Sequence, residues 1–78
     1  MAKMNQRLPV LKARDIIRVL EKVGFYEVRQ RGAHLCFKHP DGRFTIVPRH
    51  GNEDIGRGLL ARILREINIS TVEFSKML

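Results

Sequence analysis

The spacing of apolar residues predicts two helices with strands between them. The first helical pattern lies in residues 12–25, KARDIIRVLEKVGF, and its apolar face contains Ile16, Leu20 and Val23, bordered by Ile17 and Val19. Gly24 follows the last turn, where glycine commonly ends a helix, and Lys22 suits the negative end of the helix dipole. We therefore expect this helix to end just before Gly24.

From Tyr26 the period changes to two, which is typical of β-strands. Three runs fit this period: residues 26–31 (YEVRQR), 34–38 (HLCFK) and 43–47 (RFTIV). Strict alternation gives the sheet an apolar face with Tyr26, Val28, Gln30, Leu35, Phe37, Phe44 and Ile46. The opposite, open face then carries Arg29, Arg31, His34, Cys36, Lys38 and Arg43, with Thr45 and Val47 on the side of Arg43.

Turn residues separate these runs. The sequence HPDG at 39–42 predicts a hairpin, because Pro40 presets the turn and Gly42 accepts the left-handed conformation. Gly32 either turns the chain between the first two strands or forms a bulge there. Pro48 ends the third strand.

A second helical pattern covers residues 54–67, DIGRGLLARILREI, with a buried stripe of Leu60, Ile63, Leu64 and Ile67. Gly56 and Gly58 weaken its first turn by about 1 kcal/mol each relative to alanine, which indicates a late helix start or a close backbone approach. Residues 70–73, STVE, form a capping box for a short last turn. We expect an α+β fold of order α-β-β-β-α, with a three-stranded antiparallel sheet, two helices on one face, and residues 1–78 in one domain.

The charge balance narrows the possible partners. Fifteen Lys and Arg against eight Asp and Glu give a net charge of +7, which favours nucleic acid, an anionic membrane surface or an acidic protein. A merely soluble basic protein is the alternative. The single cysteine excludes an internal disulfide and favours a reducing compartment. No apolar run approaches about 18 residues, so we expect a cytoplasmic protein with no membrane span.

His34 is the candidate catalytic residue, because an imidazole can exchange protons near neutral pH. Surrounding cations would hold a phosphodiester over it, and RNA supplies its own nucleophile, the 2′-OH. The second proton-transfer group stays open among four candidates: Lys38, Tyr26, His50 and water. The expected phosphate contacts are Arg29, Arg31, Lys38 and Arg49. In the loop after Pro48, His50 is placed to reach an anion at the next helix N-terminus or to cap the loop, and its position in the sequence alone assigns it no catalytic role.

Other chemistries fit the residues less well. The run from His34 through Cys36 to His39 lacks the paired spacing of a structural zinc site. Cys36 lies about 6.5–7 Å from His34 along a strand, too far for a thiolate–imidazole pair. We therefore expect no metal ion and no cofactor.

Four segments resemble the HicA family, the toxins of HicAB toxin–antitoxin pairs, over about residues 11–74. They are LEKVGF (20–25), RGAHLCF (31–37), TIVPRH (45–50) and IGRGLLARILREINIS (55–70). The resemblance implies a fold like the double-stranded RNA-binding domain and a toxin that cleaves mRNA without a ribosome or metal. It also implies a cognate HicB antitoxin as partner. The family's catalytic histidine falls on His34, and its second histidine on His50.

Three positions depart from the family pattern. Ala33 replaces a serine or threonine, and Leu59 and Ala61 replace a threonine and an arginine. Two other functions compete with cleavage: a double-stranded RNA-binding module without catalysis, and an adaptor that binds only protein. Loss of activity with binding retained on replacing His34 would exclude the first, and salt-dependent RNA affinity would exclude the second.

Overall fold

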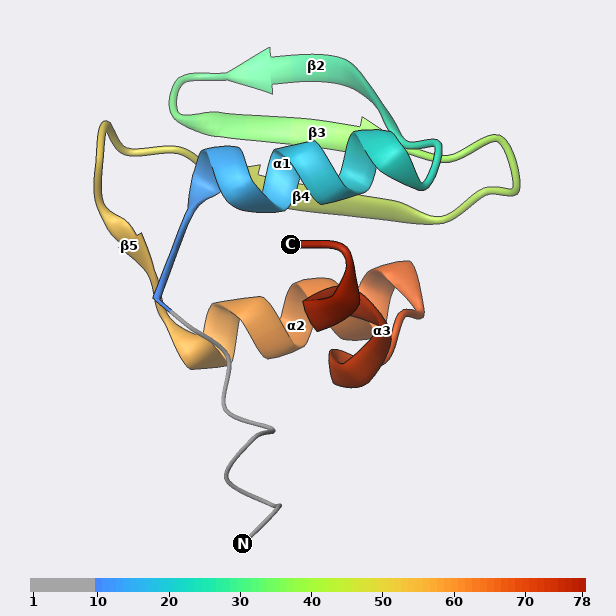
Figure 1. The fold of residues 1–78 in the computed structure, drawn as a ribbon. Coiled ribbons are helices and arrows are strands. Elements are labelled where there is room, and N and C mark those ends of the chain that lie inside the picture. Colours follow the sequence, from blue (N-terminus) through green and yellow to red (C-terminus); the bar gives the residue numbers. More distant parts are fainter. Residues whose placement is uncertain (1–9) are drawn as a thin grey trace, which may run out of the picture.

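The computed structural model describes residues 10–78 and contains the predicted elements in the predicted order (Figure 1). The elements are β1 (Leu11–Lys12), α1 (Ala13–Lys22), β2 (Tyr26–Arg31), β3 (His34–Lys38), β4 (Phe44–Pro48), β5 (Asp54–Ile55), α2 (Arg57–Ile67) and α3 (Thr71–Lys76). The strands β2, β3 and β4 form an antiparallel sheet in that order, and β1 pairs with β5. The α+β class is confirmed, whereas β1 and β5 were not predicted.

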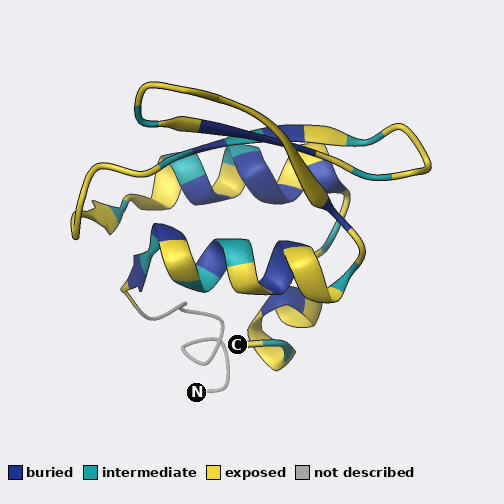
Figure 2. Cartoon of the chain, turned by 90° about the horizontal axis from the view of Figure 1, so that it is seen from above, coloured by how far each residue is buried: buried dark blue, intermediate teal, exposed yellow. Residues whose placement is uncertain are grey.

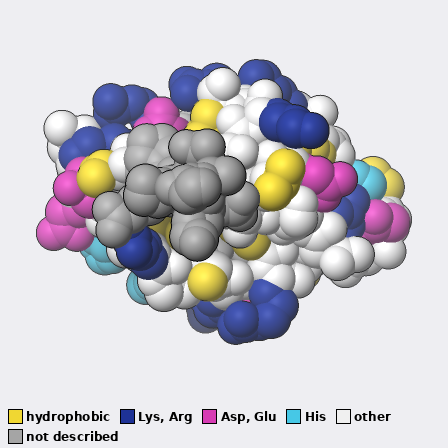
Figure 3. All heavy atoms as spheres, turned by 60° about the horizontal axis from the view of Figure 1, so that its bottom comes forward, with side chains coloured by type: hydrophobic (Ala, Val, Ile, Leu, Met, Phe, Trp, Pro, Cys, Tyr) yellow, Lys and Arg dark blue, Asp and Glu magenta, His cyan; other side chains and the backbone are white. Residues whose placement is uncertain are grey.

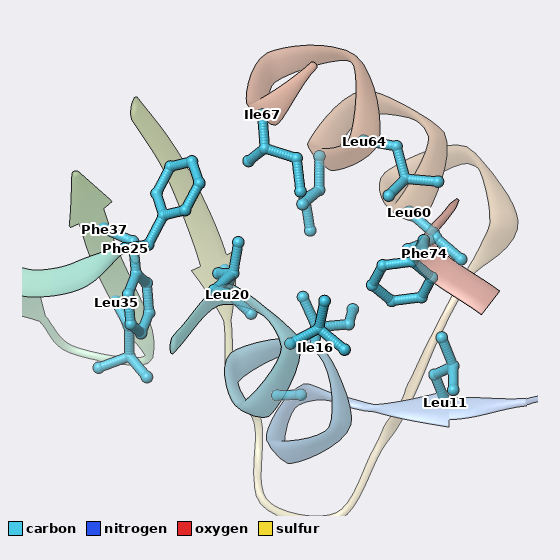
Figure 4. Packing of buried hydrophobic residues seen from close by; sticks show 14 residues of the cluster. Leu11, Ile16, Leu20, Phe25, Leu35, Phe37, Leu60, Leu64, Ile67 and Phe74 are labelled. Carbon is cyan, nitrogen blue, oxygen red and sulfur yellow. The ribbon is translucent and has the colours of Figure 1, made fainter. Parts of the chain in front are cut away.

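The helices α1 and α2 lie on the same side of the three-stranded sheet, and the other side is uncovered (Figure 2). Between these layers the apolar side chains form one cluster, to which α3 adds Phe74 (Figure 4). The predicted stripe of α2 is buried over its whole length. In α1 the centre of the face differs slightly from the prediction, because Val19 is fully buried and Val23 lies at the margin.

The ends of α1 follow its sequence. At the start, the Lys12 backbone N–H donates to Asp15 Oδ2 at 2.8 Å, and this hydrogen bond lowers the pKa of the Asp15 carboxyl. At the end, Gly24 has a φ of 103°, a conformation that glycine adopts without strain. The predicted stop is confirmed, and Phe25 turns back with its N–H on the Leu20 carbonyl at 2.9 Å.

The second helix begins at Arg57, three residues later than predicted, because Asp54 and Ile55 pair with β1. Gly56 is its N-cap, and a Cβ added at Gly58 would meet no atom within 4 Å. A late helix start is therefore the correct one of the two explanations for these glycines. The capping box at the start of α3 is confirmed. No helix within residues 10–78 is long and apolar enough to cross a membrane.

The prediction for the faces of the third strand is wrong. Phe37 pairs with Thr45 and Leu35 with Val47, so Thr45 and Val47 face the helices and are almost fully buried. The hydroxyl of Thr45 donates to a carboxylate of α2 at 2.8 Å, which satisfies it inside the core. Phe44, 45 % exposed, lies on the open face instead.

The predicted alternation of β2 is also wrong at its first residues. The pairing with β3 shifts between Glu27 and Arg29, so Val28 is an extra residue, as in a β-bulge. Because of this shift, Tyr26 and Arg29 both lie opposite open-face residues of β3, Lys38 and Cys36. Tyr26 therefore belongs to the open face and not to the face against the helices.

Arg43 does not lie on the open face, contrary to the prediction. Its guanidinium lies 5.1 Å from the centroid of the Phe25 ring and donates to the Ile67 carbonyl and to Asp41. The Arg43 backbone N–H also donates to Asp41 Oδ1 at 3.0 Å, which lowers the pKa of that carboxyl. Arg43 thus fastens the β3–β4 hairpin to the end of α2 and is a structural cation.

Candidate functional site

The open face of the sheet is defined by the pairing of three strands. His34, Cys36 and Lys38 of β3 point to it, because their neighbours Leu35 and Phe37 are buried against the helices. Their partners on β2 are Arg31, Arg29 and Tyr26, and their partners on β4 are Pro48, Ile46 and Phe44. The face therefore has a partly apolar centre with cations along its β2 side.

The cations of this face form no ion pairs with the part of the chain that the structure describes. Within residues 10–78, no ion pair involves Arg29, Arg31, Lys38 or Arg49. Among the other cations of residues 10–78, four pair with acids (Lys12, Arg18, Arg43 and Arg62), and five do not (Arg14, Lys22, Arg57, Arg65 and Lys76). Figure 3 shows the molecule from the side of α2, where basic side chains occur at separate places and acidic ones lie among them. The four cations of the sheet face are exposed, so an anionic partner could reach them.

His34 is the first residue of β3 and is exposed to solvent. Arg31 lies opposite it on β2 and Pro48 opposite it on β4. The turn just before His34 contains Gly32. Its φ of 57° confirms the predicted turn and not the alternative, a β-bulge. Past Pro48, the Arg49 backbone N–H donates to the Ala33 carbonyl at 2.6 Å. This bond keeps the chain after β4 beside the histidine.

A second histidine lies next to the first. The rings of His34 and His50 have centroids 6.0 Å apart and planes at 88°. Both line a depression of about 340 Å³, together with Pro48, Glu53, Asp54, Ile55 and Leu59. The first turn of α2 borders this depression through Leu59, one of the three positions that depart from the HicA pattern.

The predicted phosphate contacts do not all lie near His34. Arg31 and Arg49 are close to it, and Arg29 lies further along β2, opposite Cys36. Lys38 is four residues from His34 on the same strand, which is about 13 Å at 3.3 Å per residue. Lys38 and Arg29 instead line a second depression of about 560 Å³ with Val28, Cys36, Gly42 and Phe44. The cations therefore follow a line across the face, and only part of them can contact a group held at His34.

The third histidine has a structural role. His39 Nε2 donates to the Val23 carbonyl at 3.0 Å, and the His39 Nδ1 accepts the Asp41 backbone N–H at 3.1 Å. Its ring also packs on Phe25 with centroids 5.0 Å apart. Across residues 10–78, no three His, Cys, Asp or Glu side chains are grouped as ligands for a metal ion. His39 therefore offers no support to the zinc alternative.

Sequence reasoning missed two features of the site: the closeness of His34 and His50, and the apolar residues at the centre of the face. The length of the β3–β4 hairpin could have predicted both features, because it determines which residues of β3 and β4 lie opposite each other. Since Lys38 pairs with Phe44, each earlier residue of β3 has a fixed partner on β4, and His34 comes opposite Pro48. A residue two positions past Pro48 is then near His34.

Fold and site together define a small basic α+β protein with helices on one face of its sheet and with exposed histidines and cations on the other. A family model described as HicA toxin of bacterial toxin–antitoxin matches residues 13–69 of the 78. The chain belongs to this HicA toxin family, as its four sequence segments indicated, and an antitoxin is therefore its expected partner. No curated protein matches the sequence.

Proposed function

We propose that this toxin is an endoribonuclease that cleaves mRNA without a metal ion and uses His34 as a general acid or base. The observation that carries the proposal is the position of His34, exposed at the end of a sheet face whose cations have no ion-pair partners within residues 10–78. Its membership of a toxin family supports the same function. The expected site of action is the cytoplasm, where mRNA is available.

The chemistry follows from the groups on this face. RNA carries a 2′-OH beside each phosphate, so the substrate brings its own nucleophile. Arg31 and Arg49 can neutralise a phosphate near His34 and stabilise the charge that develops on it during cleavage. Arg29 and Lys38 can contact neighbouring phosphates of the same strand, because they lie further along the face.

The test is cleavage of long single-stranded transcripts by the purified chain and by His34→Ala in the presence of a chelator. We expect the parent chain alone to cleave, leaving 2′,3′-cyclic phosphate or 3′-phosphate ends. His39→Gln is the matched control, because it removes a histidine just beyond the other end of β3, and circular dichroism checks that this variant folds, since His39 is hydrogen-bonded to Val23 and Asp41. Cleavage by His34→Ala at the parent rate would exclude His34 from the mechanism. Binding without cleavage by the parent chain would instead favour a non-catalytic double-stranded RNA-binding module.

Salt dependence of RNA binding tests the phosphate contacts. Each neutralised phosphate of a single strand contributes about 0.7 to the slope of log K against log salt concentration. Arg31→Gln should therefore lower the slope by about 0.7. Arg65→Gln, on the exposed side of α2, should leave it unchanged. Equal slopes for the two variants would contradict a role for Arg31, and a slope of zero for the parent chain would favour an adaptor that binds only protein.

We further propose that the partner is an acidic, HicB-type antitoxin that covers the open face. Complementary charge accelerates association, and a partner on this face would compete with RNA. The apolar centre of the face, with Val28 47 % and Phe44 45 % exposed, adds surface that such a partner can bury. Phe44→Ser should weaken toxin–antitoxin binding and leave the cleavage rate of the free toxin nearly unchanged. Unaltered affinity would place the partner elsewhere.

A further inference from the structure

Cleavage through the 2′-OH needs two proton transfers, and the inference below rests on the cleavage proposed above. The 2′-oxygen attacks phosphorus and forms a P–O2′ bond, while the P–O5′ bond breaks. One group removes the proton from the 2′-OH, and another delivers a proton to the departing 5′-oxygen. If His34 makes one of these transfers, a second titratable group must reach the same phosphodiester.

Geometry excludes two of the four candidates for this second group. Tyr26 and Lys38 form a cross-strand pair at the far end of the sheet. Lys38 lies four residue steps along the strand from His34, about 13 Å at 3.3 Å per residue. A general acid or base works at a heavy-atom distance of about 2.6–3.2 Å from the atom it serves. Neither Tyr26 nor Lys38 can therefore act on a phosphodiester that His34 contacts.

We infer that His50 is the second proton-transfer group and that it acts with His34 on a single phosphodiester. The two ring centroids are 6.0 Å apart. Two hydrogen bonds of about 2.6–3.2 Å span a similar distance, so both rings can contact one phosphodiester. The two ring planes lie at 88° to one another, and the two proton transfers take place on two different oxygens of the phosphodiester. Both rings line the same depression.

The loop that carries His50 is held by bonds at several points. The Glu53 backbone N–H donates to the His50 carbonyl at 3.1 Å, and the Arg49 N–H is bonded to the turn before β3. From β1, Lys12 Nζ donates to the Asn52 carbonyl at 2.6 Å. Arg14 Nη1 donates to the Asn52 side chain at 3.1 Å. The position of His50 relative to His34 is thus part of the fold.

Charged groups from neighbouring elements lie around the histidine pair. Arg31 approaches from β2, and Glu53 and Asp54 approach from the loop and β5. Asp54 forms an ion pair with Lys12. Glu53, the other acid that lines this depression, has no ion pair within residues 10–78. The pH dependence of cleavage therefore belongs to the two imidazoles and these charges together.

The experiment compares His50→Gln with the parent chain on a transcript that the parent cleaves, in chelator. His50 is exposed and lies in a loop, and circular dichroism checks that the variant folds. We expect its rate of cleavage at saturating enzyme to fall by about 10²–10⁴-fold, the usual contribution of general acid–base catalysis. Its affinity for the 2′-O-methyl form of the same RNA, which cannot be cleaved, should be unchanged. His39→Gln is again the control.

Two further readouts separate proton transfer from a structural role. The parent chain should give a bell-shaped pH–rate profile, from which His34→Ala and His50→Gln each remove a different limb. The double variant should be about as slow as the slower single variant, since the two residues act as a unit. A His50→Gln profile that keeps both limbs, or a loss confined to affinity, would overturn the inference.

The failure of this inference is distinguishable from failure of the proposed function. If His34→Ala is inactive and His50→Gln cleaves at the parent rate, His50 is excluded and water becomes the second group, while the ribonuclease stands. If the parent chain itself does not cleave RNA in chelator, both proposals are wrong.

Discussion

The substitutions Val47→Ala and Ile46→Ala form a matched pair that tests which face of β4 packs against the helices. Val47 is fully buried opposite Leu35, whereas Ile46 lies on the open face opposite Cys36. Val47→Ala removes two buried carbons, each worth about 0.8 kcal/mol. The cavity raises the expected loss of stability to about 2–3 kcal/mol. For Ile46→Ala we expect a loss below about 1 kcal/mol, the span of β-propensity.

Urea unfolding followed by circular dichroism measures both losses. At about 0.05–0.15 kcal/mol per residue, a chain of this size is stable by about 4–12 kcal/mol, so both variants should remain folded. At about 4–8 °C per kcal/mol, Val47→Ala should lower Tm by roughly 10–20 °C. If Ile46→Ala is the more destabilising of the two, the register of β4 is wrong, and His34 and His50 lose their common position with it.

Three further predictions concern the stability of the fold. Asp15→Asn should cost about 0.5–1 kcal/mol at neutral pH. Because the Lys12 N–H lowers the Asp15 pKa, this stability is present above the ordinary value of 3.8 and lost as pH falls through the lowered one. The Tm difference between variant and parent should therefore close in acid. Gly24→Ala should cost about 1–3 kcal/mol by thermal unfolding, because φ is positive and the added Cβ would lie 2.9 Å from His39 Nε2. Thr45→Val should cost about 1 kcal/mol in urea, since it removes a buried hydrogen bond; an unchanged midpoint would contradict that contribution.

Periodicity predicted the helices well because each has a long amphipathic pattern. The buried stripe of α2 and the glycine stop of α1 depend on local sequence, and both are confirmed. The faces of β4 were a different case, because its five residues contain apolar side chains on both sides. Alternation favoured the large Phe44 and Ile46 as core residues, yet the hairpin register buried Thr45 and Val47. A hairpin fixes register through its loop length, which hydrophobicity does not record.

Two other features had no local signal. The bulge at Val28 lies in a run of regular alternation, and no glycine marks it. The strand pairing of residues 11–12 with residues 54–55 joins two segments about forty positions apart, and such short ladders leave no period to detect. Since that pairing holds the loop of His50, the part of the candidate site that depends on it could not be predicted from pattern alone. The exposure of His34 was predicted correctly.

The pairing of β1 with β5 has a consequence for when the site becomes competent. Since it ties down the loop between β4 and β5, the conformational entropy of that loop is lost once, during folding, and not again with each substrate. If the proposed mechanism holds, a preorganised histidine pair needs no activating rearrangement, and a newly folded copy would be ready to act at once. On that mechanism, restraint of the toxin would come from its antitoxin. The number of antitoxin molecules relative to toxin molecules, and the lifetime of their complex, would set how much activity is free.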